Sequence, residues 1–445
     1  MTRPVLVVGV GINNRPLLRY FRERGVAVVA ADRTPADRFA GPRDADVWWC
    51  LGPDYLEQAR RLAPFSEVYL TPGMVKNQPG VEVLVDADTR LTCETDLFLR
   101  SCPAPVIGIT GSAGKTTTTT LLGAILRRDG GRPVHVGGNI GESLLPALPR
   151  IDPDSWVVME LSSFQLELTT VSPHGAAVLN LAPNHLDVHP SFEAYAEAKS
   201  HIFQHQSPSD WLVLPEPPPP LMEQALERHV GRRLSFQLGE PVARGAYARD
   251  GYIRWAGGGA ERIVMPIAEW RLPGRMNLLN ACAATAMALS AGASIEAVRD
   301  AMADFEGVPH RLELVREVNG IRFVNDSIAT APDRTLAALE AVDGPLVVIL
   351  GGYDKHLDYT ELGQALRGRV RVAIVMGQTG PAIARAIGQG PPVLEAGSLQ
   401  EAVTLARTHA RSGDTVLLSP ASASYDMFRN FEERGEQFRT LVHDL

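Results

Sequence analysis

The sequence has few cysteines, no long hydrophobic run and no excess of basic residues. Its four cysteines form no Cys-x-x-Cys pair, which argues against a disulfide framework or a zinc site and favours the reducing cytoplasm. No run of 18 apolar residues occurs, and no apolar segment near the start ends in a small-residue cleavage site, so we expect neither membrane insertion nor a secretory signal. The formal net charge is −8, and general nucleic-acid binding needs a basic surface, so we expect no nucleic-acid partner.

The chain has the composition of a folded globular protein. Of its 445 residues, 45% are hydrophobic and 21% are charged, which excludes disorder as the dominant state. At roughly 150 residues per domain, this length predicts about three domains. The 40 glycines and 33 prolines favour many tight turns between short elements.

The hydrophobic pattern predicts an α/β fold in three units. Near the N-terminus, apolar runs at 4–8 and 26–31 flank a helical pattern at 15–24, which is typical of a Rossmann-like parallel sheet covered by helices. Further strands are expected in the first unit at 46–49, 67–70 and 83–85. The second unit has predicted strands at 105–110, 156–160, 176–181 and 211–214, helices at 116–128 and 278–291, and a proline loop at 215–220. A third Rossmann-like unit, which begins near residue 307, has predicted strands at 347–350, 373–376 and 415–418 and helices at 362–366 and 399–409.

A phosphate-binding loop is the sharpest local motif. Residues 108–117 read GITGSAGKTT, with a predicted strand before them and a predicted helix after them. Glycines let backbone N–H groups surround an anion at a helix N-terminus, where Lys115 would contact the β- and γ-phosphates and Thr116 would bind Mg²⁺. Five residues rather than four separate Gly108 from the Gly-Lys pair, so the spacing is a variant. An Asn-Lys-x-Asp motif, which a GTPase would use to read guanine, is absent.

A second glycine turn lies at Gly9-Val-Gly11. Asn14 stands where a dinucleotide fingerprint has its third glycine, and Asp32 ends the next predicted strand, where an acid often binds a ribose. The turn fits an NAD pyrophosphate, a UDP pyrophosphate or a plain strand–helix connection, and the local pattern does not choose among them.

Three further side chains are candidates for metal chemistry. Glu160 ends a predicted strand beside the phosphate loop, a common place for a Mg²⁺ ligand, although a solvated acid fits equally. His185 would be either a second metal ligand or a structural or surface histidine. Taken alone, Lys199 is typical of an exposed helical lysine.

The order of the motifs resembles the Mur ligase family over nearly the whole chain. After the phosphate loop come GGNIG at 137–141, ELSSFQLE at 160–167, NHLDVHP at 184–190 and PGRMNLLNACAA at 273–284, followed by HRLE at 310–313, NDSIAT at 325–330 and LSPASASYDMF at 418–428. The resemblance implies a UDP-sugar-binding domain at 1–97, a central P-loop ATPase-type domain at 98–306 and an amino-acid-binding domain at 307–445.

The resemblance also implies a reaction. ELSSFQLE and the C-terminal motifs favour the family member that adds glutamate, with the D enantiomer expected, to UDP-N-acetylmuramoyl-L-alanine. ATP would convert the substrate carboxylate into an acyl phosphate, which the amine of glutamate attacks. We expect a cytoplasmic monomer that uses two Mg²⁺ ions and a carbamylated lysine.

The family's functional residues carry over to numbered positions. Catalytic roles fall on Lys115, Glu160, His185 and Lys199, and Mg²⁺ ligands on Thr116, Glu160, His185 and carbamylated Lys199. ATP-binding positions are Gly111, Ser112, Ala113, Gly114, Lys115, Thr116, Thr117, Asn277, Asn280, Arg311 and Asp326. UDP-sugar positions are Ile12, Asn13, Asp32, Arg33, Thr34, Gly73, Asn139 and His185. Amino-acid positions are Thr330, Lys355, Ser419 and Tyr425.

Four positions depart from the family pattern, and alternatives stay open. Met276 stands where His is common, Asn184 replaces a frequent Asp, Ile328 replaces a frequent Lys, and Tyr425 replaces a frequent Phe. The loss of a cation at Ile328 leaves amino-acid recognition open, including addition of L-glutamate or another amino acid. A folylpolyglutamate synthase would lack the N-terminal domain. A nicotinamide dehydrogenase would leave the phosphate loop unexplained, and a non-catalytic nucleotide-binding module would need no second metal site.

Overall fold

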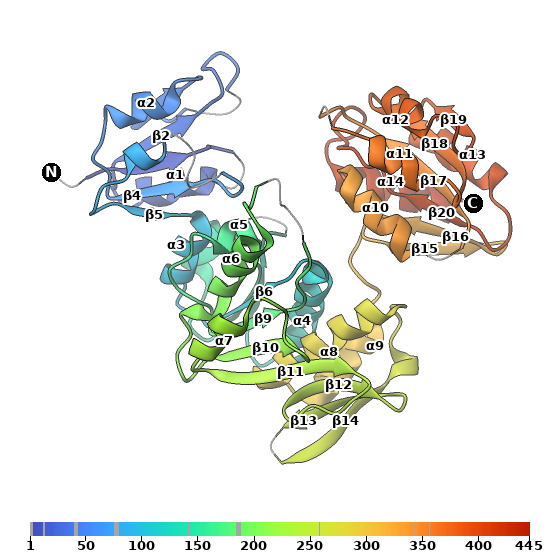
Figure 1. The fold of residues 1–445 in the computed structure, drawn as a ribbon, viewed down its shortest axis with the longest axis horizontal. Coiled ribbons are helices and arrows are strands. Elements are labelled where there is room, and N and C mark those ends of the chain that lie inside the picture. Colours follow the sequence, from blue (N-terminus) through green and yellow to red (C-terminus); the bar gives the residue numbers. More distant parts are fainter. Residues whose placement is uncertain are drawn as a thin grey trace. The chain divides into compact units, whose positions relative to one another are not determined.

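The computed structural model describes residues 3–11, 14–39, 43–74, 80–140, 143–183, 188–257, 259–342, 344–355 and 357–445. The chain divides into two compact units, Met1–Phe305 and Glu306–Leu445 (Figure 1). Three sheets rich in parallel strands run through these units, two in the first and one in the second. The predicted α/β class is therefore confirmed.

The N-terminal sheet is parallel throughout, with the strand order β3-β2-β1-β4-β5. Its elements are β1 (Val5–Val8), α1 (Arg15–Arg22), β2 (Val28–Asp32), β3 (Val47–Leu51), α2 (Tyr55–Arg60), β4 (Glu67–Leu70), η1 (Glu82–Leu84) and β5 (Arg90–Thr92). The central strand β1 is fully buried, because helices and the following domain cover both faces of the sheet.

The strand predicted at 83–85 is wrong, because η1, a 3₁₀ turn, occupies that segment. Val81 and Leu84 are buried while Val83 is 51% exposed. An i, i+3 spacing of buried residues matches the three-residue turn of a 3₁₀ helix rather than the alternation of a strand.

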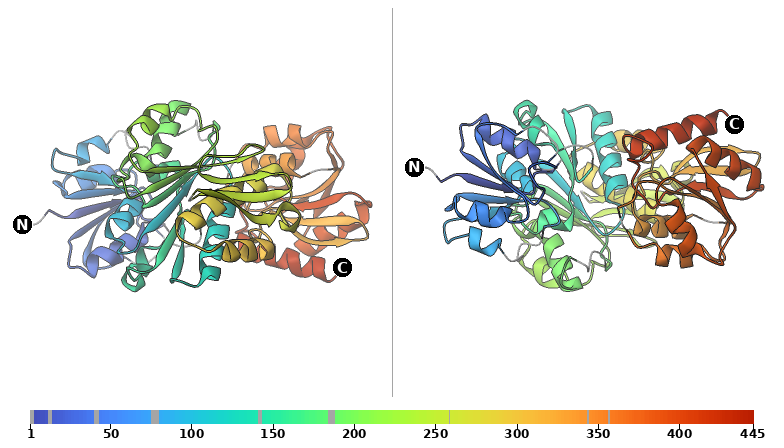
Figure 2. Two further views of the ribbon diagram at one scale, coloured as in Figure 1. Left: turned by 90° about the horizontal axis from the view of Figure 1, so that it is seen from below. Right: turned by 90° about the horizontal axis from the view of Figure 1, so that it is seen from above.

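The central sheet has nine strands in the order β14-β13-β12-β11-β10-β9-β6-β8-β7. Its strands are β6 (Val106–Thr110), β7 (Val134–Gly138), β8 (Trp156–Glu160), β9 (Gly175–Val178), β10 (Trp211–Pro215), β11 (Arg232–Leu238), β12 (Gly245–Arg249), β13 (Tyr252–Gly257) and β14 (Ala260–Pro266). Strands β12 to β14 form an antiparallel ribbon that leaves β14 as the edge of the sheet (Figures 1 and 2).

Helices cover this sheet and position the site. They are α3 (Glu94–Ser101), α4 (Lys115–Asp129), η2 (Leu145–Arg150), α5 (Ser163–Leu166), α6 (Phe192–Gln204), α7 (Glu223–Arg228), η3 (Ile267–Glu269), α8 (Arg275–Ser290) and α9 (Ile295–Asp304). The alanine-rich α8 packs directly against α4, because its small side chains permit a close approach. This packing brings the start of α8 to the phosphate loop.

The second unit has one six-stranded sheet with the order β15-β16-β20-β17-β18-β19. Only β15 is antiparallel to its neighbour among these strands. The elements are β15 (Glu313–Val318), β16 (Ile321–Asn325), α10 (Pro332–Ala341), β17 (Leu346–Gly351), α11 (Thr360–Ala365), β18 (Val370–Met376), α12 (Gly380–Ile387), β19 (Val393–Ala396), α13 (Leu399–His409), β20 (Thr415–Leu418) and α14 (Phe431–His443). Separate hydrophobic clusters fill the two faces, one beneath α13 and α14 and the other beneath α10 to α12.

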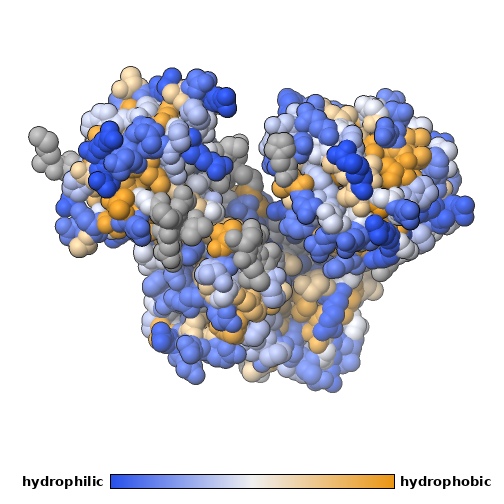
Figure 3. Space-filling model, turned by 45° about the horizontal axis from the view of Figure 1, so that its top comes forward, coloured by the Kyte–Doolittle hydropathy of each residue, from blue (hydrophilic) through white to orange (hydrophobic). Residues whose placement is uncertain are grey.

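The surface is mixed in character. On the face shown in Figure 3, hydrophilic residues cover most of each unit, and hydrophobic residues lie in scattered groups. Within the described ranges, no helix is long and apolar enough to cross a membrane.

Candidate functional site

The phosphate loop connects β6 to α4 at the carboxyl end of the sheet. Gly111 and Gly114 both have positive φ angles, +156° and +82°. A Cβ atom at Gly114 would collide with the Asn280 side chain, which α8 places against the loop. Glycine is therefore required here for its backbone angle and for the approach of α8.

Two lysines meet at this loop. Lys115 Nζ donates to the Gly111 carbonyl at 3.0 Å, and Lys199 Nζ donates to the same carbonyl at 3.1 Å and to Thr110 Oγ1 at 3.2 Å. Lys199 is only 2% exposed, so its interpretation as an exposed helical lysine is wrong. Burial lowers the pKa of Lys199 well below its usual value, and the neighbouring Lys115 charge lowers it further. The Glu160 charge opposes this shift.

Glu160 joins the phosphate loop to the following motif. Its carboxylate accepts a hydrogen bond from Thr116 Oγ1 at 2.7 Å and one from Asn139 Nδ2 at 2.9 Å. A threonine hydroxyl and a carboxylate are hard oxygen ligands, and Mg²⁺ is usually held by one or two such groups together with substrate phosphates. These residues therefore fit a Mg²⁺ ion, although no group of three acidic, His or Cys ligands occurs within the described residues.

The phosphate loop is held by contacts that its motif does not predict. Asn180 Oδ1 accepts from the Ala113 amide at 2.8 Å, and Asn180 Nδ2 donates to the Ala113 carbonyl at 2.9 Å. Ser112 Oγ lies 3.1 Å from the Tyr195 hydroxyl. Two signals in the sequence point to these residues: Asn180 lies at the end of the strand predicted at 176–181, and Tyr195 stands one helical turn before Lys199.

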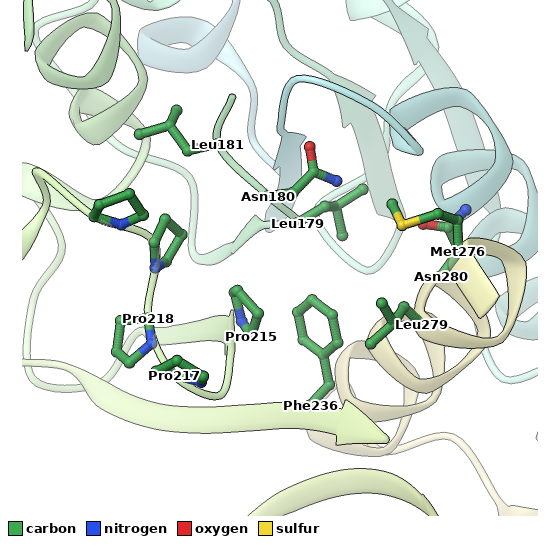
Figure 4. A pocket seen from close by; sticks show the side chains of 12 residues that line it. Leu179, Asn180, Leu181, Pro215, Pro217, Pro218, Phe236, Met276, Leu279 and Asn280 are labelled. Atoms are coloured by element: carbon green, nitrogen blue, oxygen red, sulfur yellow. The ribbon is translucent and has the colours of Figure 1, made fainter. Parts of the chain in front are cut away.

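A pocket of about 290 Å³ adjoins the phosphate loop (Figure 4). Met276, Leu279 and Asn280 of α8 face the proline run across it, and Phe236 lies between the two sides. Pro215 ends β10, but the rest of the proline segment is a loop, as predicted, and the segment also forms one wall of this pocket. Asn277 lies nearby, but its side-chain amide donates to the Pro273 carbonyl at 2.8 Å.

The first glycine turn, Gly9-Val-Gly11, differs from the phosphate loop in the side chains that hold it. Asp32 accepts from the amides of Val10 at 2.8 Å and Thr34 at 2.9 Å, so its carboxylate holds both the turn and its own loop. Asn14 is buried and donates to the Val8 carbonyl at 3.1 Å. Arg33 and Gly73 are exposed, and Gly73 has a φ of +86°. The predicted contacts Ile12 and Asn13 lie outside the described residues, as do Asn184 and His185.

The predicted amino-acid residues fall into buried and exposed sets. Ser419 is fully buried, where its hydroxyl donates to Asp326 Oδ2 at 2.8 Å and lies 3.0 Å from Thr335 Oγ1. Burial raises the pKa of Asp326 to about 7, against the opposing hydrogen bond from Ser419. By contrast, Tyr425 is 60% exposed, and the exposed Lys355 places its ammonium 5.8 Å from the Tyr425 ring centroid. Thr330 and Arg311 are partly buried.

Family models match the part of the chain that holds the phosphate loop and most of the second unit. Residues 109–288 match the model of the Mur ligase middle domain, and residues 310–422 match the Mur ligase glutamate ligase domain. The UDP-N-acetylmuramoylalanine–D-glutamate ligase of Symbiobacterium thermophilum is 45% identical over 448 residues, covering 99% of this chain and 97% of that relative. The chain belongs to the Mur ligase family.

Other Mur ligases extend the comparison. The enzyme of the same name from Acetivibrio thermocellus is 38% identical over 459 residues, with 100% of this chain and 97% of the relative covered. The structure of UDP-N-acetylmuramate–alanine ligase from Thermotoga maritima has the same fold, with a TM-score of 0.54, 19% identity and 99% coverage of both chains. Mur ligases use ATP and Mg²⁺, and this one is accordingly an ATP-dependent ligase.

The Mur ligase middle domain contains the cluster that the structure brings together. It consists of the phosphate loop from Gly111 to Thr117 with Asn139, Glu160, Lys199 and Asn280. The dehydrogenase alternative explains only the first glycine turn, whereas family membership accounts for the phosphate loop as well.

Proposed function

We propose that this Mur ligase joins D-glutamate to UDP-N-acetylmuramoyl-L-alanine with cleavage of ATP, a step in the synthesis of a peptidoglycan precursor in the cytoplasm. The observation that carries the proposal is similarity over the full length to relatives named for this reaction. The contacts among Lys115, Thr116, Glu160 and Lys199 support it, because they form a site for ATP-dependent chemistry.

The site performs this reaction by positioning and charge neutralisation. A carboxylate is a poor electrophile, so the γ-phosphoryl group of ATP is first transferred to it, with ADP leaving. The glutamate amine then attacks the acyl carbon, and phosphate leaves as the amide forms. In this arrangement Lys115 and the loop amides bind the ATP phosphates, and Thr116 and Glu160 hold Mg²⁺. The ion supplies positive charge that neutralises the phosphate oxygens.

We propose that Lys199 acts through a covalent modification. Its burial favours the neutral amine, whose lone pair can add to CO₂ with loss of a proton to give a carbamate. This change converts a base into an anionic oxygen ligand, so we propose that carbamylated Lys199 and His185 hold a second Mg²⁺ ion.

The three substrates are assigned to three parts of the chain, 1–97, 98–306 and 307–445. The proposed UDP-sugar contacts are Ile12, Asn13, Asp32, Arg33, Thr34, Gly73, Asn139 and His185. Asn277, Asn280, Arg311 and Asp326 are proposed to serve ATP, and the pocket beside Asn280 is proposed to receive the adenine base. Thr330, Lys355, Ser419 and Tyr425 are proposed to bind the amino acid. We propose that the enzyme acts as a monomer.

The test is phosphate release from ATP in the presence of UDP-N-acetylmuramoyl-L-alanine and a panel of amino acids. We expect release with D-glutamate, weaker or no release with L-glutamate, and none with the Lys115→Ala variant. Release with neither enantiomer would contradict the proposal. A preference for L-glutamate would instead favour the related ligase activity that the loss of a cation at Ile328 leaves open.

A further inference from the structure

Arg434 is a buried cation that the proposed reaction does not use. It lies in the first turn of α14 and is 0% exposed. None of the ion pairs found among the described residues involves it. A charged group in such a place is costly unless hydrogen bonds satisfy it, so its contacts indicate what it does.

The guanidinium of Arg434 is bonded to two loops that follow neighbouring strands. Its Nε donates to Ser327 Oγ at 3.0 Å and one Nη donates to the Ser327 carbonyl at 2.9 Å, in the loop after β16. The other Nη donates to the carbonyls of Ser422 at 3.1 Å and Ala423 at 3.3 Å, in the loop after β20. Ser327 Oγ in turn donates to the Phe431 carbonyl at 2.8 Å, so the loop after β16 is also bonded to the first residue of α14.

A third loop donates a hydrogen bond to the Ala423 carbonyl, which Arg434 also contacts. The Ala423 carbonyl also accepts from the Tyr353 amide at 2.8 Å, in the segment that follows β17. Gly352 has no room for a side chain, because a Cβ atom there would collide with the Ala423 carbonyl and approach Arg434 within 3.2 Å. Arg434 therefore sits at the junction of three loops from adjacent strands.

These loops carry the residues proposed to bind the amino acid. Ser327 precedes Thr330 by three positions, Ser422 and Ala423 lie between Ser419 and Tyr425, and Tyr353 precedes Lys355 by two. We infer that Arg434 is a positioning residue for the amino-acid site, in which its planar fork fixes the three loops at the spacing that a dicarboxylate amino acid requires. This inference rests on the proposed function.

The chemistry of arginine suits this task. Five N–H donors in a fixed plane can bind several carbonyls at once, whereas a lysine ammonium is a single point with no fork. Burial lowers the pKa of Arg434 to about 10, so the group remains charged near neutral pH. Asp426 counteracts that shift through its charge, and its Oδ2 accepts from the Gln378 amide.

The experiment compares Arg434→Lys and Ser327→Ala with a matched control, Arg371→Lys. The lysine variant keeps the charge and loses the fork, while Ser327→Ala removes one hydroxyl, which accepts from Arg434 and donates to Phe431, and is the milder change. Arg371 belongs to the same unit and binds Asp414 at 2.8 and 3.1 Å, at the opposite end of β20. Each full-length variant is assayed for KM for glutamate, KM for ATP and kcat, and for hydrogen–deuterium exchange without substrate.

We expect Arg434→Lys to raise KM for glutamate about tenfold and Ser327→Ala about threefold, on the scale of one or two lost hydrogen bonds, with KM for ATP nearly unchanged. Exchange should increase at residues 326–330 and 420–425 in both, and not in Arg371→Lys. The inference is overturned if KM for glutamate rises equally in the control, or if exchange in the loops is unchanged. The exchange result needs no reaction, so it remains decisive if the wild-type enzyme does not use glutamate and the proposed function fails.

Discussion

Two buried ionisable groups, Lys199 in the first unit and Asp326 in the second, respond to burial in opposite directions. Lys199 is 2% exposed and Asp326 is 4% exposed, and each lies at the carboxyl end of central parallel strands. Desolvation lowers the pKa of the amine and raises that of the carboxyl group to about 7. The same physical cause therefore moves a base and an acid towards their neutral forms.

Lys199 and Asp326 differ in the consequences of burial. A neutral amine is a nucleophile, so burial prepares Lys199 for covalent modification. Asp326 instead accepts hydrogen bonds from Ser419 Oγ and the Leu312 amide, and these bonds favour its charged form against the burial that raises its pKa. Burial thus favours reactivity at Lys199, whereas at Asp326 the surrounding hydrogen bonds oppose its effect.

The largest effect should come from Lys199→Ala. Loss of the proposed metal-binding carbamate should remove several kcal/mol of transition-state stabilisation, so activity should fall roughly 100- to 1,000-fold. Short carboxylic acids should restore part of it, because they can occupy the place of the carbamate. Wild-type protein in ¹³C-labelled bicarbonate should show a carbamate signal in carbon NMR that is absent from the variant.

The control for this test is Lys115→Ala, which should be inactive and should not recover with carboxylic acids. Unchanged activity in Lys199→Ala would show that Lys199 takes no part in the reaction. Lys199 and Asp326 would then both have structural roles only.

The second prediction concerns Asp326→Asn and pH. The folded-state pKa of about 7 is above the unfolded value, so stability is fully present below about pH 4 and is lost as pH rises through 7. The asparagine variant does not ionise, so its stability relative to wild type should increase by roughly 2–4 kcal/mol between pH 5 and pH 8. Hydrogen exchange of β16 and β20 amides checks this, and an equal difference at both values would refute it.

The opposite slope is expected for Lys199→Met. The lowered folded-state pKa means that the buried amine must be protonated at a cost as pH falls, so wild type should lose stability on acidification relative to the methionine variant. Thermal unfolding in CO₂-free buffer between pH 6 and pH 9 measures this trend. Lys355→Met, which changes an exposed lysine, is the control.

The smallest effect should come from Asn180→Ala, which removes a neutral polar group that contacts the phosphate loop. The loss of its two contacts to Ala113 should raise KM for ATP about fivefold, on the scale of 1 kcal/mol for an intramolecular hydrogen bond. Because no charge is involved, the effect should be the same at pH 6 and pH 8. Asn14→Ala, in the first glycine turn, should leave KM for ATP unchanged.

Local features of the fold were predictable because they depend on neighbouring residues. The strands at 67–70, 156–160 and 415–418 and the helix at 399–409 have the predicted bounds, since continuous apolar runs and helical spacing are local signals. The ribbon from β12 to β14 was missed, although β14 contains the short apolar run Ile263-Val264-Met265 and β13 alternates the buried Ile253 and Trp255 with less buried residues. The Asp250-Gly251 turn between β12 and β13 was a further signal.

The site was predictable only in part, for a related reason. The phosphate loop has a motif of its own, whereas Asn180 has a role only because β9 lies beside β6 in the sheet. Arg434 and Ser327 are 107 residues apart, and nothing local connects them. The surroundings of Lys199 alone are typical of an exposed lysine, and only the family resemblance singled it out, because the burial of one helical residue depends on what packs against it.

The edge of the central sheet has a practical consequence for handling this protein. Strand β14 presents backbone groups that another chain could extend, which is how concentrated samples begin to aggregate. Glu261 and Arg262 place opposite charges along that strand, and Pro266 ends it with a residue that has no N–H group to offer. Engineers who shorten or neutralise this ribbon should expect lower yields of dispersed protein, even if every substrate contact is intact.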